Sequence, residues 1–186
     1  MMETQSEPII HDKPTRTVTF RINSHVLEKL QVHAKFEKST VNALVNKLLF
    51  QAIEWNVIAA KSNWVPTERD VIKSVLDNLD DETIVQIAKR EGKTLPKDLC
   101  LSMHGICGMD EWMNIIKLRS YVAGFDLTSM NDDKGSVYVM HHDMGKKYSL
   151  HSKSFYEQAF KEFECDAVFE DSENTLVFQI SKQLSA

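Results

Sequence analysis

Hydrophobic and polar residues alternate strictly over positions 15–23 of the chain. The apolar side of this alternation holds Val18, Phe20 and Ile22, and the polar side holds Thr17, Thr19 and Arg21. Successive side chains of a strand point to opposite faces, so a period of two that is rich in β-branched residues predicts a half-buried strand. We expect this strand at residues 15–22.

The apolar positions then change to helical spacing. A helix is predicted at 24–37, where Asn23 or Ser24 can cap its start. A second helix is predicted at 41–56, with Ser39 and Thr40 as candidate caps.

A single strand followed by two helices is not a finished domain, because the strand has two open edges and no partner. A symmetric dimer, in which two strands pair and four helices interlock, is the economical solution. We therefore expect a flexible arm at 1–13 and a dimerisation module at 14–60.

The rest of the chain predicts an α+β domain at 66–186, after a joint at 63–67 that contains Pro66. Its order is helix–strand–strand–helix–strand–strand, with an antiparallel sheet. The helices are expected at 68–79, 80–90, 110–122 and 149–163, and the strands at 125–130, 136–142, 165–170 and 175–181. Residues 91–98 are expected to form a loop, 100–108 are ambiguous, and 131–135 carry a hairpin-turn signal.

Charge divides the chain. The net charge of −5 argues against a protein that coats nucleic acid with its whole surface. The window 13–47, however, holds seven Lys or Arg against two Glu, so it carries +5 and leaves −10 for the remainder. This asymmetry indicates an anion-binding module joined to an acidic one.

Composition and termini limit the setting. With 42% hydrophobic residues the chain can build a core without disulfides, and three cysteines are too few for a disulfide framework. No signal peptide or membrane-spanning run is evident, so we expect a cytoplasmic protein with no membrane partner.

The segment TVTFRI, the helix after it and the turn EKSTVNALV resemble the ribbon-helix-helix repressors, such as Arc and the methionine repressor. The resemblance covers about the first third of the chain and implies a homodimer bound to double-stranded DNA. It implies that Thr17, Thr19 and Arg21 contact the DNA bases. It also implies that Thr40, Val41 and Asn42 bind a DNA phosphate. The family's usual glycine in the turn is absent, and Glu37, Lys38 and Ser39 fill that place.

Physical chemistry supports these roles independently. A two-stranded ribbon fits the major groove, where Arg can bond guanine bidentately and Thr can offer hydroxyl or methyl contacts. The free amides and the dipole at the start of a helix attract phosphate.

The sequence also contains two weaker candidates. Cys100, His104 and Cys107 are spaced to ligate zinc or another transition metal, with a fourth ligand from His141, His142 or Cys165. The alternative is that both cysteines are small buried hydrophobes and His104 is a surface residue. The loop after His142 either binds an anion through Gly145, Lys146 and Lys147 or is simply a polar surface.

Three functions follow from these features. The first is a transcription regulator whose C-terminal domain senses a small molecule, a metal or a partner, as a homodimer or a tetramer. The second is an antitoxin or partition-type DNA-binding protein whose C-terminal region binds a protein. The third is a small enzyme, which we rank last because no catalytic motif is present.

Overall fold

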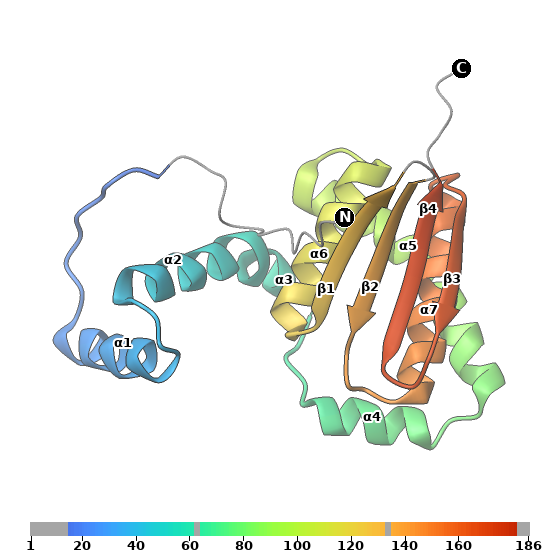
Figure 1. Cartoon of the computed structure of the whole chain (residues 1–186), viewed down its shortest axis with the longest axis horizontal. Helices are drawn as coiled ribbons and strands as arrows, with labels where there is room; N and C mark the ends of the chain where they lie inside the picture. Colours follow the sequence, from blue (N-terminus) through green and yellow to red (C-terminus); the bar gives the residue numbers. More distant parts are fainter. Residues whose placement is uncertain (1–14, 62–63, 133–134, 182–186) are drawn as a thin grey trace. The chain divides into compact units, whose positions relative to one another are not determined.

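The computed structural model of the chain describes residues 15–61, 64–132 and 135–181. The predicted flexible arm at 1–13 therefore lies outside the described residues. Contacts divide the chain into two compact units that meet between Val65 and Pro66. Figure 1 shows the helices and strands of both units, coloured along the sequence.

The N-terminal unit is mostly helical between Ser24 and Lys61. Helix α1 spans Ser24–Phe36, and Asn23 caps it by accepting a 2.9 Å hydrogen bond from the backbone N–H of His25. Helix α2 spans Val41–Gln51 and continues through the π-helical turn η1, Ala52–Asn56, into α3, Val57–Lys61. The predicted end at residue 56 is thus five residues short.

The turn between α1 and α2 supplies the conformation that a glycine would otherwise supply. Lys38 has a φ of 51°, in the left-handed region. The Ser39 N–H bonds the Ala34 carbonyl at 2.8 Å, and the Lys38 N–H bonds the Lys35 carbonyl at 3.2 Å. This pair of bonds is the Schellman motif that closes the C-terminus of a helix.

Residues 15–22 do not form the predicted strand in the single chain. No ladder pairs with them among the described residues, and they lead into α1 as a segment without regular structure. Val18 is 74% exposed and Phe20 is 56% exposed. The physical reason is that a strand requires a partner, and the described residues of this unit include no second strand.

The C-terminal unit is α+β, as predicted. Its elements in chain order are α4 Arg69–Asp77, α5 Asp81–His104, α6 Met109–Ala123, β1 Asp126–Asp132, β2 Gly135–His141, α7 Lys146–Glu162, β3 Ala167–Asp171 and β4 Thr175–Ser181. The four strands form one antiparallel sheet in the order β1-β2-β4-β3. The predicted order of helices and hairpins in this unit is confirmed.

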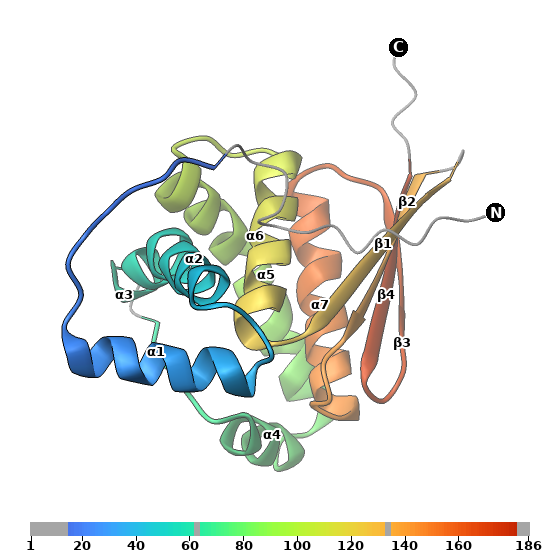
Figure 2. The ribbon, with the colours of Figure 1, turned by 60° about the vertical axis from the view of Figure 1, so that its left-hand side comes forward.

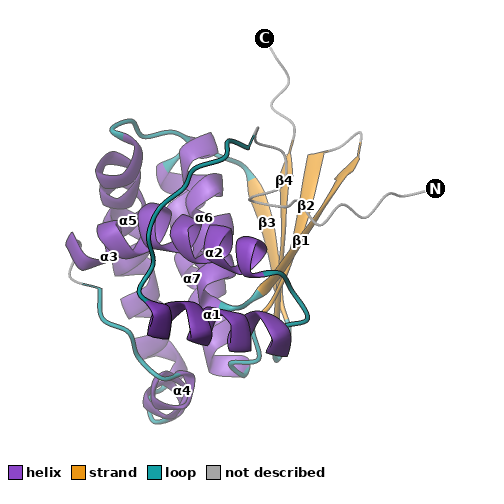
Figure 3. Ribbon diagram, turned by 90° about the vertical axis from the view of Figure 1, so that its left-hand side faces the viewer, coloured by secondary structure: helices purple, strands orange, loops and turns teal. Residues whose placement is uncertain are grey.

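Helices α5, α6 and α7 lie on one face of that sheet (Figure 2), and no other helix described in this unit covers the opposite face (Figure 3). The covered face packs Met140, Phe169, Leu176 and Phe178 against the helices, and all four are buried. Neighbouring strands align Tyr138, Phe178 and Phe169 in register, and the rings stack with centroids 4.9 and 5.7 Å apart. The helical layer contributes Trp112, Phe155 and Phe160 to the same core.

The predicted loop at 91–98 is wrong, because α5 is a single helix of 24 residues that runs through Pro96. Gly92, four residues before Pro96, is buried against α7, and a Cβ there would lie 2.5 Å from the carbonyl oxygen of Phe155. Tertiary packing of α5 on α7 therefore outweighs the local signals of Gly and Pro. The first part of the ambiguous segment 100–108 forms the last turn of this helix, which ends at His104.

Candidate nucleic-acid interface

The polar face of the first described segment is open to solvent. Thr17, Thr19 and Arg21 are all exposed, at alternate positions ahead of α1. Because no strand of the described chain pairs with this segment, its backbone is also available for a ladder with another chain. The base-reading role of these three residues stays a prediction.

The start of α2 has the geometry of an anion-binding helix terminus. Thr40 caps the helix, and its hydroxyl oxygen accepts a 3.1 Å hydrogen bond from the Ala43 N–H. The hydroxyl proton of Thr40 can still be donated outward. The amides of Val41 and Asn42 belong to the first turn, where an α-helix provides no acceptor of its own. Three donors from adjacent residues can therefore meet one phosphate.

Basic side chains of the N-terminal unit are open to solvent. Arg16, Arg21, Lys29, Lys35 and Lys38 are exposed. Lys47 forms an ion pair of 3.4 Å with Glu37, in which both side chains are more than 40% exposed. An ion pair with this exposure is weak, so Lys47 remains available to a phosphate.

Exposed apolar side chains are the most unusual feature of the N-terminal unit. Only Ala34 and Leu44 are buried in α1 and α2. The exposed large apolar residues of the unit are Val18, Phe20, Ile22, Val26, Leu27, Val32, Phe36, Leu48, Leu49, Ile53, Val57 and Val65. A surface this apolar on a small unit is typical of sites where another protein surface binds.

The predicted metal ligands lie around the end of α5. Cys100 is fully buried, whereas His104 and Cys107 are exposed. Throughout the described ranges, no group of three or more His, Cys, Asp or Glu side chains is placed to hold a metal ion. The structure therefore does not bring Cys100, His104 and Cys107 together as a ligand set.

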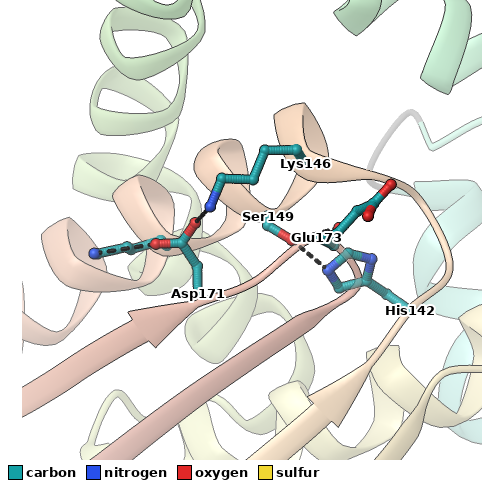
Figure 4. A network of polar contacts seen from close by, with 6 residues as sticks. His142, Lys146, Ser149, Asp171 and Glu173 are labelled. Atoms are coloured by element: carbon teal, nitrogen blue, oxygen red, sulfur yellow. Dashed lines mark hydrogen bonds and ion pairs between the residues drawn. The ribbon is translucent and has the colours of Figure 1, made fainter.

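His142 is buried in a hydrogen-bond network that the sequence did not indicate (Figure 4). Its Nδ1 accepts a 3.0 Å hydrogen bond from the Met144 N–H, so the proton of the neutral ring lies on Nε2. Nε2 is 2.9 Å from Oγ of Ser149, and that hydroxyl donates to the Glu173 carbonyl at 3.1 Å. Burial is the main cause that lowers the pKa of His142 to about 4.

This His–Ser pair does not have the polarity of a nucleophile and its base. A base would have to accept the serine proton, but Nε2 is the donor here and the Ser149 proton is directed to a backbone carbonyl. Both side chains are also buried away from any substrate. The network holds the turn after β2, the start of α7 and the β3–β4 turn together.

The lysines at the start of α7 are engaged within the protein. Lys146 and Lys153 pair with the two oxygens of Asp171, at 2.5 and 3.2 Å (Figure 4). Lys147 donates to the Leu79 carbonyl and lies 3.9 Å from Asp81. The interpretation of this loop as an anion site has no support from these contacts. The other interpretation, a polar surface loop, does not hold for His142, because its side chain is buried. Neither periodicity nor spacing in the sequence signals this burial.

A comparison with models of known protein families gives no match for the chain, and a comparison with curated proteins gives none either.

Across the described residues, no helix is both long enough and apolar enough to cross a bilayer.

Proposed function

We propose that the chain is a sequence-specific, DNA-binding transcription regulator that acts as a homodimer of the ribbon-helix-helix type. One observation carries the proposal: the N-terminal unit exposes an apolar surface on its first segment and on both helices, and buries only Ala34 and Leu44 within those helices. A second copy of the same surface is a partner that is always present at equal concentration.

Pairing of two copies would place the first segment in a ribbon. Val18, Phe20 and Ile22 would then face the helices of both copies, and each buried side chain would contribute roughly 1.5–3 kcal/mol. The alternation would leave Thr17, Thr19 and Arg21 on the outer face of the ribbon. That face is the one that enters the major groove.

Phosphate contacts would set the position of the ribbon on the duplex. Thr40, Val41 and Asn42 provide the donors at the start of α2, and Lys38 lies two residues before Thr40 with its charge exposed. Contacts of this kind fix the register of a protein on DNA but carry no sequence information.

We assign the C-terminal unit a role in sensing an effector or binding a partner. Its folded core and four-stranded sheet do not resemble the short, unstructured toxin-binding segments expected of an antitoxin. No described group of residues supports a metal as the effector, so a small molecule or a protein is the better candidate.

The test begins with selection of binding sites from random duplexes by the purified protein. Fluorescence titration of the selected and a scrambled duplex, at one salt concentration, then compares variants. Arg21→Ala should weaken the free energy of binding to the selected duplex by about 1–3 kcal/mol per lost base contact, and by about twice that in a dimer with two copies of Arg21. The variant should also lose its preference for the selected site over the scrambled one. Thr40→Ala should weaken binding to the selected and the scrambled duplex about equally.

Arg90→Ala provides the matched control. Arg90 is exposed on α5 in the other unit, where it pairs with Glu91, so its removal should leave DNA affinity unchanged. If Arg21→Ala binds the selected duplex as tightly as the parent protein and the Arg90 variant, the ribbon does not read DNA and the proposal fails.

A further inference from the structure

One face of the sheet in the C-terminal unit is covered by no described helix of that unit (Figure 3). Helices α5, α6 and α7 pack on the face that holds Met140, Leu176 and Phe178. Successive side chains of a strand point to opposite faces, so the alternate residues form the other side, which we call the open face. Its described residues are Asp126, Thr128, Met130, Val137, Val139, His141, Val168, Glu170, Thr175, Val177 and Gln179.

The strand register arranges the open face in rows. One row consists of Met130, Val137, Gln179 and Val168, and the next consists of Thr128, Val139, Val177 and Glu170. The central strands β2 and β4 therefore carry valines on this face. Its described carboxylates, Asp126 and Glu170, lie on the edge strands β1 and β3. An apolar centre with polar edges is typical of a sheet face that packs against another sheet.

We propose that the open face binds the open face of a second copy, and that this contact joins two DNA-binding dimers into a tetramer. The inference rests on the proposed function for the dimer and adds a second interface to it. Sheets that pack face to face lie about 10 Å apart and keep their strands nearly aligned. Closed tetramers with two-fold interfaces are common among homo-oligomers.

The open face is complementary to itself. A two-fold axis parallel to the strands places the edge strand β1 of one copy over β3 of the other, and β2 over β4. Val139 then meets Val177 of the second copy. Glu170 meets Thr128 of the second copy, whose hydroxyl can donate to the carboxylate, so the two Glu170 carboxylates are kept apart. The axis generates each of these pairs twice in one sheet contact.

The ribbon dimer makes this contact effective. A single sheet contact buries few rows of side chains, so protomers without a ribbon should stay apart at micromolar concentration. A dimer carries two open faces, and once one of them is bound the other binds at a high effective concentration. The resulting tetramer carries two ribbons and can hold two DNA sites.

Thr128→Glu tests the pairing by sedimentation equilibrium of the full-length protein. It places a carboxylate opposite Glu170 of the second copy, so the dissociation constant of the tetramer should rise at least about tenfold. Within one chain the two positions lie three strands apart, roughly 14 Å, where salt screens their repulsion. Adding Glu170→Lys to Thr128→Glu turns the repulsion into an attraction and should restore the tetramer.

Thr94→Glu is the matched control, because Thr94 is exposed on α5 and the substitution adds the same charge away from the open face. It should form the tetramer as the parent protein does. The proposal is overturned if the parent stays a dimer over the whole micromolar range, which would leave the open face to another occupant. It is also overturned if the double variant dissociates as readily as Thr128→Glu.

A second measurement separates this interface from DNA binding. Parent protein bound to an immobilised duplex should capture a second, labelled copy of the selected duplex. Thr128→Glu should bind one duplex with the affinity of the parent but lose this capture. If Thr128→Glu captures the second duplex as well as the parent does, the sheet contact does not join the dimers. Failure of the parent to bind even one duplex would instead contradict the proposed function.

Discussion

Lys38 holds a backbone conformation that usually requires glycine. A left-handed residue with a side chain costs roughly 1–2 kcal/mol, yet the two hydrogen bonds of the turn are formed around it. The sequence indicates the place of this turn through the caps at Ser39 and Thr40. It does not indicate the conformation, because Glu37, Lys38 and Ser39 carry no glycine signal.

His142 is the residue whose environment the sequence predicted least well. Adjacent histidines before a polar loop suggest a surface, but the β3–β4 turn covers His142. The Asn174 carbonyl accepts from the His142 N–H at 3.1 Å, and the Asn174 side chain accepts from the Gly145 N–H at 2.9 Å. These contacts join residues 32 and 29 positions apart, which no local pattern can encode.

Burial of a neutral histidine makes stability depend on pH. The folded pKa of His142, about 4, lies below the ordinary value of 6.5, so the unfolded chain binds the proton more readily. This contribution is complete above pH 6.5 and is lost as pH falls toward 4. We expect it to lower the free energy of unfolding by about 2 kcal/mol between pH 7 and pH 5.

Denaturant unfolding at pH 7 and pH 5 measures this loss. His142→Gln should lose less stability than the parent protein over the same interval, and His25→Gln, at an exposed position, should behave as the parent. Some dependence will remain, because burial also lowers the pKa of His151. Asp80, Glu162 and Asp171 have pKa values below their ordinary range, so their contributions are lost at lower pH. Equal losses in the parent and His142→Gln would contradict the assignment.

At the scale of elements, periodicity predicted the helices and hairpins of the C-terminal unit because each strand buries one face. Leu176 and Phe178 of β4 are buried on the helical side, while Val168 of β3 is 66% exposed on the other. The failures have a common cause. The continuity of α5 depends on α7, which lies far away in the sequence, and a strand at 15–22 would need a partner strand that the described chain does not supply.

The contact of α5 with α7 depends on Gly92. A Cβ at this position would lie 2.5 Å from the Phe155 carbonyl oxygen, a backbone atom that cannot turn away. The higher helix propensity of alanine would stabilise the folded Gly92→Ala variant by up to about 1 kcal/mol. Overpacking against α7 should destabilise it by more, since overpacking typically costs about 1–3 kcal/mol. We expect a net decrease in the free energy of unfolding, measured by denaturant titration.

Thr94→Ala is the control for this comparison. Thr94 is exposed on the same helix, so its replacement changes propensity without adding a contact. Stability within about 0.5 kcal/mol of the parent is expected. If Gly92→Ala is as stable as Thr94→Ala, the helices have room for a methyl group and the close approach does not explain the glycine.

At the scale of the whole molecule, the two units differ in both charge and completeness. The window 13–47 carries +5 in a chain of net charge −5, and it includes the segment and helices that leave their apolar side chains exposed. The C-terminal unit, by contrast, has a core that buries Trp112, Phe155, Phe160 and Phe178, although other apolar residues such as Val71 and Val168 are exposed. The acidic unit has a core of its own, whereas the basic unit leaves most of its apolar side chains exposed. This arrangement is expected if assembly and anion binding use the same part of the chain.

Phe20 offers the most direct test of that arrangement. It is 56% exposed in the single chain, and the proposed ribbon would bury it between two copies. Phe20→Glu would place two like charges in the dimer core, so the variant should sediment as a monomer at micromolar concentration and lose DNA binding. Val168→Glu changes an apolar residue with 66% exposure on the sheet of the other unit and should remain a dimer that binds DNA. The comparison requires equal concentrations in sedimentation equilibrium and one salt concentration in the DNA titration, since assembly and DNA affinity depend on these conditions. A parent protein that sediments as a well-folded monomer, or a Phe20→Glu variant that still dimerises, would show that the exposed segment does not join the two copies.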